Sequence, residues 1–165
     1  MAFPADGQDS PKPLLTPGPL VENLKALHTA AIDARHGYEE ARHDAHGKGM
    51  SPLFADMIDR HTRNASDLAG EMGTDADGLN QDGSFMSVVH RSIMDVRALF
   101  GGLGDSVLPG LIDGEKRNVH QYQKVLASSD MTPGVRAVIE TNRSRLEDAL
   151  SEMSLLAAQS AIVRS

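Results

Sequence analysis

The chain has 165 residues, of which 24% are charged and 40% hydrophobic, and its formal net charge is −7. This is the profile of a single soluble globular domain, and the acidic balance argues against nucleic acid or an anionic membrane as a partner. Cysteine is absent, which excludes disulfides, thiolate metal sites and cysteine nucleophiles, and no apolar segment is long enough to cross a bilayer.

Residues 1–16 contain three prolines among small polar residues and show no hydrophobic periodicity. This composition predicts a disordered N-terminal tail, followed by a helical domain over residues 17–165. The tail has no basic region followed by an apolar one, so it does not resemble a secretory signal. We therefore expect a cytoplasmic protein.

The first two helices are predicted from apolar residues that recur every three or four positions. The first begins at Pro19 and runs to about His46, with Gly47 as its stop signal. The second begins at Ser51, a good N-cap residue followed by proline, and ends near Gly73.

The second half of the chain begins with a polar loop over residues 74–83, followed by a short predicted helix over residues 84–100. A third long helix is expected from about Asp105. Thr132 and the proline after it repeat the cap-plus-proline pattern and open a fourth helix, whose last residues we expect to fray.

The order of these elements predicts an all-α fold, since no strand pattern occurs. Short connections should make helices one and two, and helices three and four, antiparallel hairpins. The link between the hairpins is much longer and contains its own short helix, so it can cross the bundle. Two hairpins joined by one long crossover form the ferritin-like type of four-helix bundle.

One polar residue interrupts the apolar stripe of each long helix: Arg35, His61, Glu115 and Asn142. Each lies at a similar distance from the turn of its hairpin, and equal distances mean equal heights in antiparallel helices. These residues should therefore form one polar layer in the middle of the bundle. The first interpretation is an Arg35–Glu115 ion pair, hydrogen-bonded to the other two side chains, that fixes the helix register.

A second interpretation is metal binding in the same layer, where carboxylate-bridged di-metal bundles hold their ligands. No Glu-x-x-His pair of the kind those proteins use occurs in the second or fourth long helix, and Arg35 places a permanent positive charge where a carboxylate is needed. A smaller site for iron, manganese or zinc, made by Asp33, His61 and Glu115, stays open as the alternative.

A separate candidate metal site lies on the first helix, where His36, Glu40 and His43 share one face. This face is opposite the apolar stripe, so a solvated surface explains it equally well. The sequence contains no phosphate-binding glycine loop, G-x-S-x-G, H-E-x-x-H or calcium-loop pattern. We therefore expect no catalytic residues and no required cofactor.

Short motifs in four of the predicted helices resemble a known family in their order and spacing: Asp33 and Gly37-Tyr38; Val89-His90-Arg91 and Leu99-Phe100-Gly101-Gly102; Gly114-Glu115 and Tyr122; Pro133 and Val135-Arg136. The chain resembles a family of uncharacterised bacterial ferritin-like four-helix-bundle proteins, a domain of unknown function. The resemblance covers about residues 20–155 and implies descent from metal-binding bundles, with a role in stress response or metal handling.

Two functions follow as expectations. The favoured one is a non-catalytic, stress-associated structural or interaction protein, which forms a homodimer or binds another protein. An apolar face of the short crossover helix, in excess of what the bundle covers, would form the dimer contact. The alternative is a metal-binding ferritin-like protein that uses the polar layer.

Overall fold

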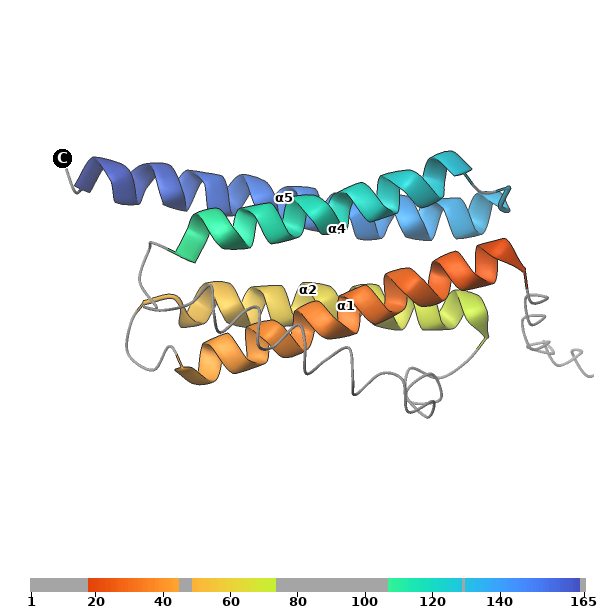
Figure 1. The fold of residues 1–165 in the computed structure, drawn as a ribbon, viewed down its shortest axis with the longest axis horizontal. Coiled ribbons are helices and arrows are strands. Elements are labelled where there is room, and N and C mark those ends of the chain that lie inside the picture. Colours follow the sequence, from red (N-terminus) through yellow and green to blue (C-terminus); the bar gives the residue numbers. More distant parts are fainter. Residues whose placement is uncertain (1–17, 45–48, 74–106, 129, 164–165) are drawn as a thin grey trace, which may run out of the picture.

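The computed structural model describes residues 18–44, 49–73, 107–128 and 130–163. These ranges form four helices and no strand, which confirms the predicted all-helical class: α1 Pro19–Asp44, α2 Ser51–Met72, α4 Leu108–Ser128 and α5 Pro133–Val163 (Figure 1). The predicted tail, the stop at Gly47 and the short helix over residues 84–100 lie outside the described residues. None of the described helices is long and apolar enough to span a membrane.

The helix ends follow local backbone chemistry. Gly73 adopts a left-handed conformation with φ of 71° and closes α2, as its place after the apolar stripe predicts. Thr132 caps α5, because its Oγ1 accepts the N–H of Val135 at 3.3 Å.

One predicted helix end was wrong. Ser51 is the first residue of α2 rather than its N-cap, and Met50 occupies the cap position without a side-chain hydrogen bond. The predicted start of the third long helix near Asp105 lies outside the described residues, in which α4 begins at Leu108, and α5 is helical to Val163, the last described residue. Proline is compatible with several positions in the first turn of a helix, so it locates the first residue of the helix only to within a residue or two.

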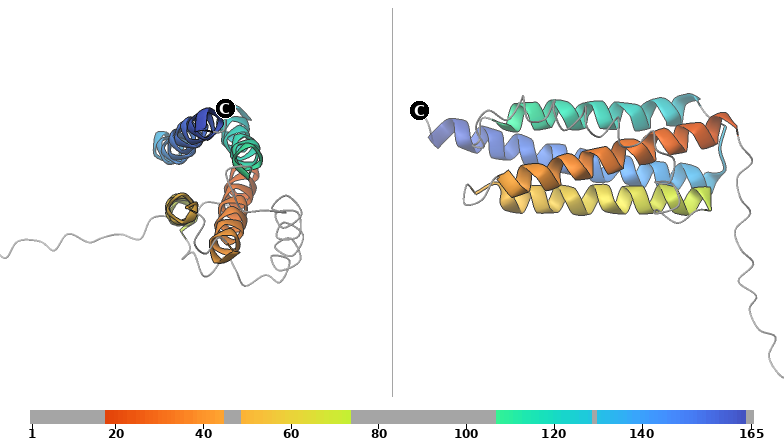
Figure 2. Two further views of the ribbon diagram at one scale, coloured as in Figure 1. Left: turned by 90° about the vertical axis from the view of Figure 1, so that its left-hand side faces the viewer. Right: turned by 60° about the horizontal axis from the view of Figure 1, so that its bottom comes forward.

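The four helices lie side by side as a bundle (Figures 1 and 2). Helices α1 and α2 pack together, as do α4 and α5, and the two hairpins meet through contacts between α2 and α5 and between α1 and α4. Neighbouring helices run in opposite directions, so the diagonal partners α2 and α4 run parallel. A side chain that joins α2 to α4 must therefore cross the centre of the bundle.

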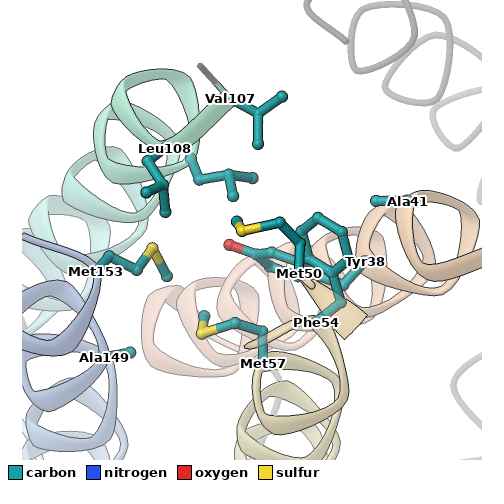
Figure 3. Packing of buried hydrophobic residues seen from close by; sticks show 10 residues of the cluster. Tyr38, Ala41, Met50, Phe54, Met57, Val107, Leu108, Ala149 and Met153 are labelled. Atoms are coloured by element: carbon teal, nitrogen blue, oxygen red, sulfur yellow. The ribbon is translucent and has the colours of Figure 1, made fainter. Parts of the chain in front are cut away.

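Two apolar clusters fill the two ends of the bundle. One surrounds Phe54 and Met57 and includes Tyr38, whose hydroxyl points inward among the methionines and leucines (Figure 3). The other surrounds Leu68 and Ile139. Both clusters draw residues from all four helices. His61, Asn64 and Glu115 lie between the two clusters along their helices, whereas Asn142 lies within the second cluster, between Ile139 and Leu146.

Candidate functional site

Glu115 is a carboxylate in the apolar interior, with only 2% of its surface exposed. It lies on the same face of α4 as Leu111 and Val119, one turn before and one turn after it. An ionised carboxylate in this position is tolerated only when hydrogen bonds replace its water. The neighbours of Glu115 therefore decide what it can do.

Three donors from three helices satisfy this carboxylate. The hydroxyl of Tyr38 on α1 donates to Oε1 at 2.9 Å, and Nε2 of His61 on α2 donates to the same oxygen at 3.0 Å. Nδ2 of Asn118, one turn along α4, donates to Oε2 at 3.2 Å. We call Tyr38, His61, Glu115 and Asn118 the Glu115 cluster.

The hydrogen bonds set the charge state of the cluster. Burial by itself raises the pKa of Glu115, but the nearby His61 ring and the hydrogen bonds from His61, Asn118 and Tyr38 outweigh it and lower the pKa. Burial, with the Glu115 charge beside it, raises the pKa of the Tyr38 hydroxyl well above its usual value. Tyr38 therefore remains a neutral donor and Glu115 an ionised acceptor.

The ring of His61 is held from two sides. It stacks on Tyr38, with the ring centroids 5.8 Å apart and an angle of 21° between the planes. Because a carboxylate only accepts hydrogen bonds, the bond to Glu115 places a proton on Nε2. The opposite nitrogen, Nδ1, is buried and has no hydrogen-bond partner within the described part of the chain.

The predicted ion pair between Arg35 and Glu115 was wrong for the described residues. Arg35 retains 27% exposure of its side chain and pairs instead with Glu39, one turn further along α1, at 3.6 Å. Counting residues from a turn gives the height of a side chain but not its direction around the helix. On α1 it is Tyr38, one turn beyond Arg35, that reaches the carboxylate.

Asn142 is fully buried, as expected for the polar layer, but its partner is Asn64 rather than Glu115. Asn64 of α2 and Asn142 of α5 form a second polar unit, which we call the asparagine pair. Arg145 lies over it and donates from Nη1 to the amide oxygens of Asn64 and Asn142 and to Asp67. The predicted single layer is therefore two adjacent units, one centred on α4 and one between α2 and α5.

The residues predicted to bind a metal ion do not come together as a set of ligands in the described part of the chain. In the ranges that the structure describes, no three histidine or carboxylate side chains come close enough together to hold a metal ion. Asp33 is only partly buried and is not grouped with His61 and Glu115. In the second candidate metal site, on the surface of α1, Nε2 of His36 lies 3.0 Å from a guanidinium nitrogen of Arg35. The positive charge of this neighbour disfavours a bound cation.

Sequence reasoning missed Tyr38 and Asn64 as members of the buried polar units. Tyr38 lies one turn beyond Arg35 on α1, and a buried tyrosine hydroxyl needs a hydrogen-bond partner. Asn64 follows His61 and precedes Leu68 at the spacing of core positions on α2. An asparagine at such a position predicts a polar partner on the facing helix, and this signal was present in the sequence.

Fold and site together define an all-helical protein with a buried carboxylate that is hydrogen-bonded by three helices. The chain belongs to the family described as a domain of unknown function, DUF2383, whose model matches residues 20–128. The matched range contains the whole Glu115 cluster and ends with α4. Searches of curated proteins and of solved structures gave no match.

Proposed function

We propose that this protein is a non-catalytic helical bundle that works as a structural or interaction protein. The observation that carries the proposal is that the Glu115 carboxylate is buried and that both of its oxygens already accept hydrogen bonds from the protein. The donors are Tyr38, His61 and Asn118, and the side chain is 2% exposed. A general base or a metal ligand needs a lone pair directed at a substrate or an ion. In Glu115 these lone pairs accept hydrogen bonds from side chains of the bundle itself.

The Glu115 cluster has a clear structural use in this proposal. It links α4 with the diagonal helix α2 and the neighbouring helix α1 through one carboxylate oxygen. Buried polar groups of this kind contribute little net stability, but they penalise every register in which a donor or acceptor loses its partner. The cluster therefore selects one alignment of the two hairpins.

We further propose that the bundle is ferritin-like. Helices α2 and α4 run parallel, so the end of α2 and the start of α4 lie at opposite ends of the bundle (Figure 1). A long connection of this kind between two hairpins is the arrangement of the ferritin-like bundles. The stress-associated role implied by the family resemblance belongs to the same proposal, and expression under stress conditions would test it.

The alternative function is metal binding by the Glu115 cluster, with iron, manganese or zinc as the candidates. One observation favours it: Nδ1 of His61 is buried without a hydrogen-bond partner among the described residues. This nitrogen could serve as a ligand. Because Nε2 and not Nδ1 faces Glu115, an ion shared by His61 and this carboxylate would require the His61 ring to turn over.

The deciding experiment compares Glu115→Ala with the wild type by urea unfolding and by elemental analysis of untagged protein exposed to Fe(II), Mn(II) and Zn(II). Removal of the carboxylate leaves two buried donors, Tyr38 and His61, and the partly buried Asn118 without this acceptor, so we expect a loss of about 3–5 kcal/mol with no change in metal content. Asp113→Ala, on the exposed face of the same helix, is the matched control. One or two equivalents of metal that depend on Glu115 would instead establish the alternative.

A further inference from the structure

The last turns of α5 extend beyond the ends of the other three helices (Figures 1 and 2). This follows from length, because α5 has 31 residues whereas α1, the next longest described helix, has 26. Four large apolar side chains on this extension face solvent: Leu155, Leu156, Ile162 and Val163, which are 64%, 39%, 75% and 85% exposed. We call residues 155–163 the α5 tip.

The composition of the α5 tip differs from the rest of the surface. From Met153 to Val163 the sequence has no charged residue, although 24% of the whole chain is charged. Ala157, on the core side, still packs against the apolar cluster around Phe54. Apolar side chains thus occupy both the core-facing side and the opposite side, and a helix that is apolar on all sides is normally covered by other structure.

We propose that a second copy of this chain covers the α5 tip, with the two tips packed antiparallel across a two-fold axis. Leu155, Ala158 and Ile162 are spaced as neighbours along one stripe of the helix. A two-fold axis that passes between residues 158 and 159 places Leu155 opposite Ile162 of the second copy, and Ile162 opposite Leu155 of the second copy. The stripe is therefore self-complementary, as a two-fold contact requires.

The central residue of the stripe has a small side chain. Ala158 ends at Cβ and is exposed, and the axis places it at the height of Gln159 of the second copy. The nearest carboxylate on α5 is Glu152, which Arg60 already binds at 2.9 Å. In the antiparallel arrangement Glu152 lies at the edge of the contact. Two copies with a net charge of −7 can thus meet through an uncharged surface.

A lipid surface fits the α5 tip less well. Helices that lie on anionic membranes have lysine or arginine along the polar face. From Leu146 to Ser165 the chain has three acidic residues, Glu147, Asp148 and Glu152, and one basic residue, Arg164. An anionic membrane would repel this segment, whereas a second neutral tip would not.

The size of the contact predicts its strength. Nine helical residues span only about 14 Å, and a contact of this length buries less than the roughly 800 Å² per partner of a stable interface. The dimer should therefore form and dissociate with concentration. This inference rests on the proposed function as an interaction protein, and it assigns the association to α5 rather than to the crossover segment.

The test is sedimentation of the full chain from about 1 μM to about 1 mM, a range that covers weak association. We expect the wild type to dimerise and Leu155→Glu with Ile162→Glu to raise the apparent dissociation constant at least about tenfold. Ala137→Glu with Ser144→Glu is the matched control, because it adds the same charges at the same spacing to exposed positions elsewhere on α5. A wild type that stays monomeric, or an unchanged double variant, would overturn the proposal.

Cysteine cross-linking tests the direction of packing, since the chain has no cysteine of its own. A mixture of Leu155→Cys and Ile162→Cys proteins should give mainly the mixed disulfide, with Ala137→Cys as the unlinked control. Exclusive 155–155 and 162–162 links would overturn the antiparallel arrangement. Binding to vesicles of anionic phospholipid that Leu155→Glu abolishes would assign the tip to lipid instead. None of these results depends on Glu115 or on metal content, so this inference and the proposed function fail separately.

Discussion

Asn64 and Asn142 each donate a side-chain N–H to the main-chain carbonyl oxygen of the other, and both hydrogen bonds measure 3.1 Å. The exchange is symmetric because α2 and α5 run antiparallel where they meet. Arg145 then donates to both amide oxygens, at 3.0 and 2.9 Å. Both side-chain amides are therefore satisfied although the two residues are completely buried.

This exchange predicts strong coupling between the two asparagines. Asn142→Leu removes the side-chain donor to the main-chain carbonyl of Asn64 and one acceptor of Arg145, while Asn64 keeps its own bond to the main-chain carbonyl of residue 142. We therefore expect a loss of about 1–3 kcal/mol in the free energy of unfolding. When both residues are leucine, the two apolar side chains lie against each other instead of against a polar amide, and the double variant should lose less than the sum of the single losses. Urea unfolding of the two singles and the double measures this difference.

Thr141→Ala, at the exposed neighbouring position, controls for a change on the same turn of α5 and should alter stability by less than about 0.5 kcal/mol. Additive losses in the double variant would mean that the two asparagines do not act as a unit. The register of α2 against α5 would then depend on apolar packing and on the ion pairs Arg60–Glu152 and Arg145–Asp67.

Tyr38→Phe removes one of the three donors to Glu115 and leaves the aromatic ring in place. A hydrogen bond to a charged group contributes about 1.5–3 kcal/mol, so we expect a loss of this order at neutral pH. The loss should become smaller in acid, because the pKa of Glu115 is lowered in the folded chain. The ionised carboxylate stabilises the fold above the pKa that Glu115 has in the unfolded chain, and this stabilisation disappears as the pH falls through the pKa of Glu115 in the folded chain. Urea unfolding over a pH series measures both effects, and a loss that stays constant into acid would show that the hydroxyl does not interact with the carboxylate charge.

The long helices could be predicted because periodicity is a property of each segment alone. Gly73 and Thr132 end and begin helices where the sequence placed them, through backbone conformation and a local hydrogen bond. The composition of the polar units could be predicted only in part. His61 and Glu115 were correctly placed at one height, but whether Arg35 or Tyr38 reaches them depends on the rotation of α1 about its axis. That rotation is set by packing of the whole bundle, which no single stripe encodes.

The position of Arg35 outside the Glu115 cluster leads to a third prediction. Because Arg35 pairs with the half-exposed Glu39 at the surface, Arg35→Leu should change the free energy of unfolding by less than about 1 kcal/mol. If Arg35 neutralised Glu115 in the core, the same change would cost about 3–5 kcal/mol. Urea unfolding of this one variant separates the two arrangements, with Glu39→Gln as the control for loss of the surface pair.

Asp33 supplies the last prediction, because its environment opposes ionisation. Burial raises the pKa of this carboxyl from 3.8 to about 6, and its Oδ1 has no hydrogen-bond partner within the described residues. The folded chain thus keeps a proton that the unfolded chain releases between these two pH values. Asp33 therefore lowers stability progressively as pH rises from about 4 to about 6, and the penalty persists at higher pH.

Asp33→Asn should remove this penalty, since an amide of the same shape carries no charge. We expect the variant to unfold at higher urea concentration than the wild type above pH 6 and at nearly the same concentration near pH 4. Asp113→Asn, on the exposed face of α4, controls for the loss of a negative charge as such. If Asp33→Asn were instead less stable than the wild type at neutral pH, the ionised Asp33 carboxylate would have a favourable partner, and the case for a ligand at this position on α1 would be reopened.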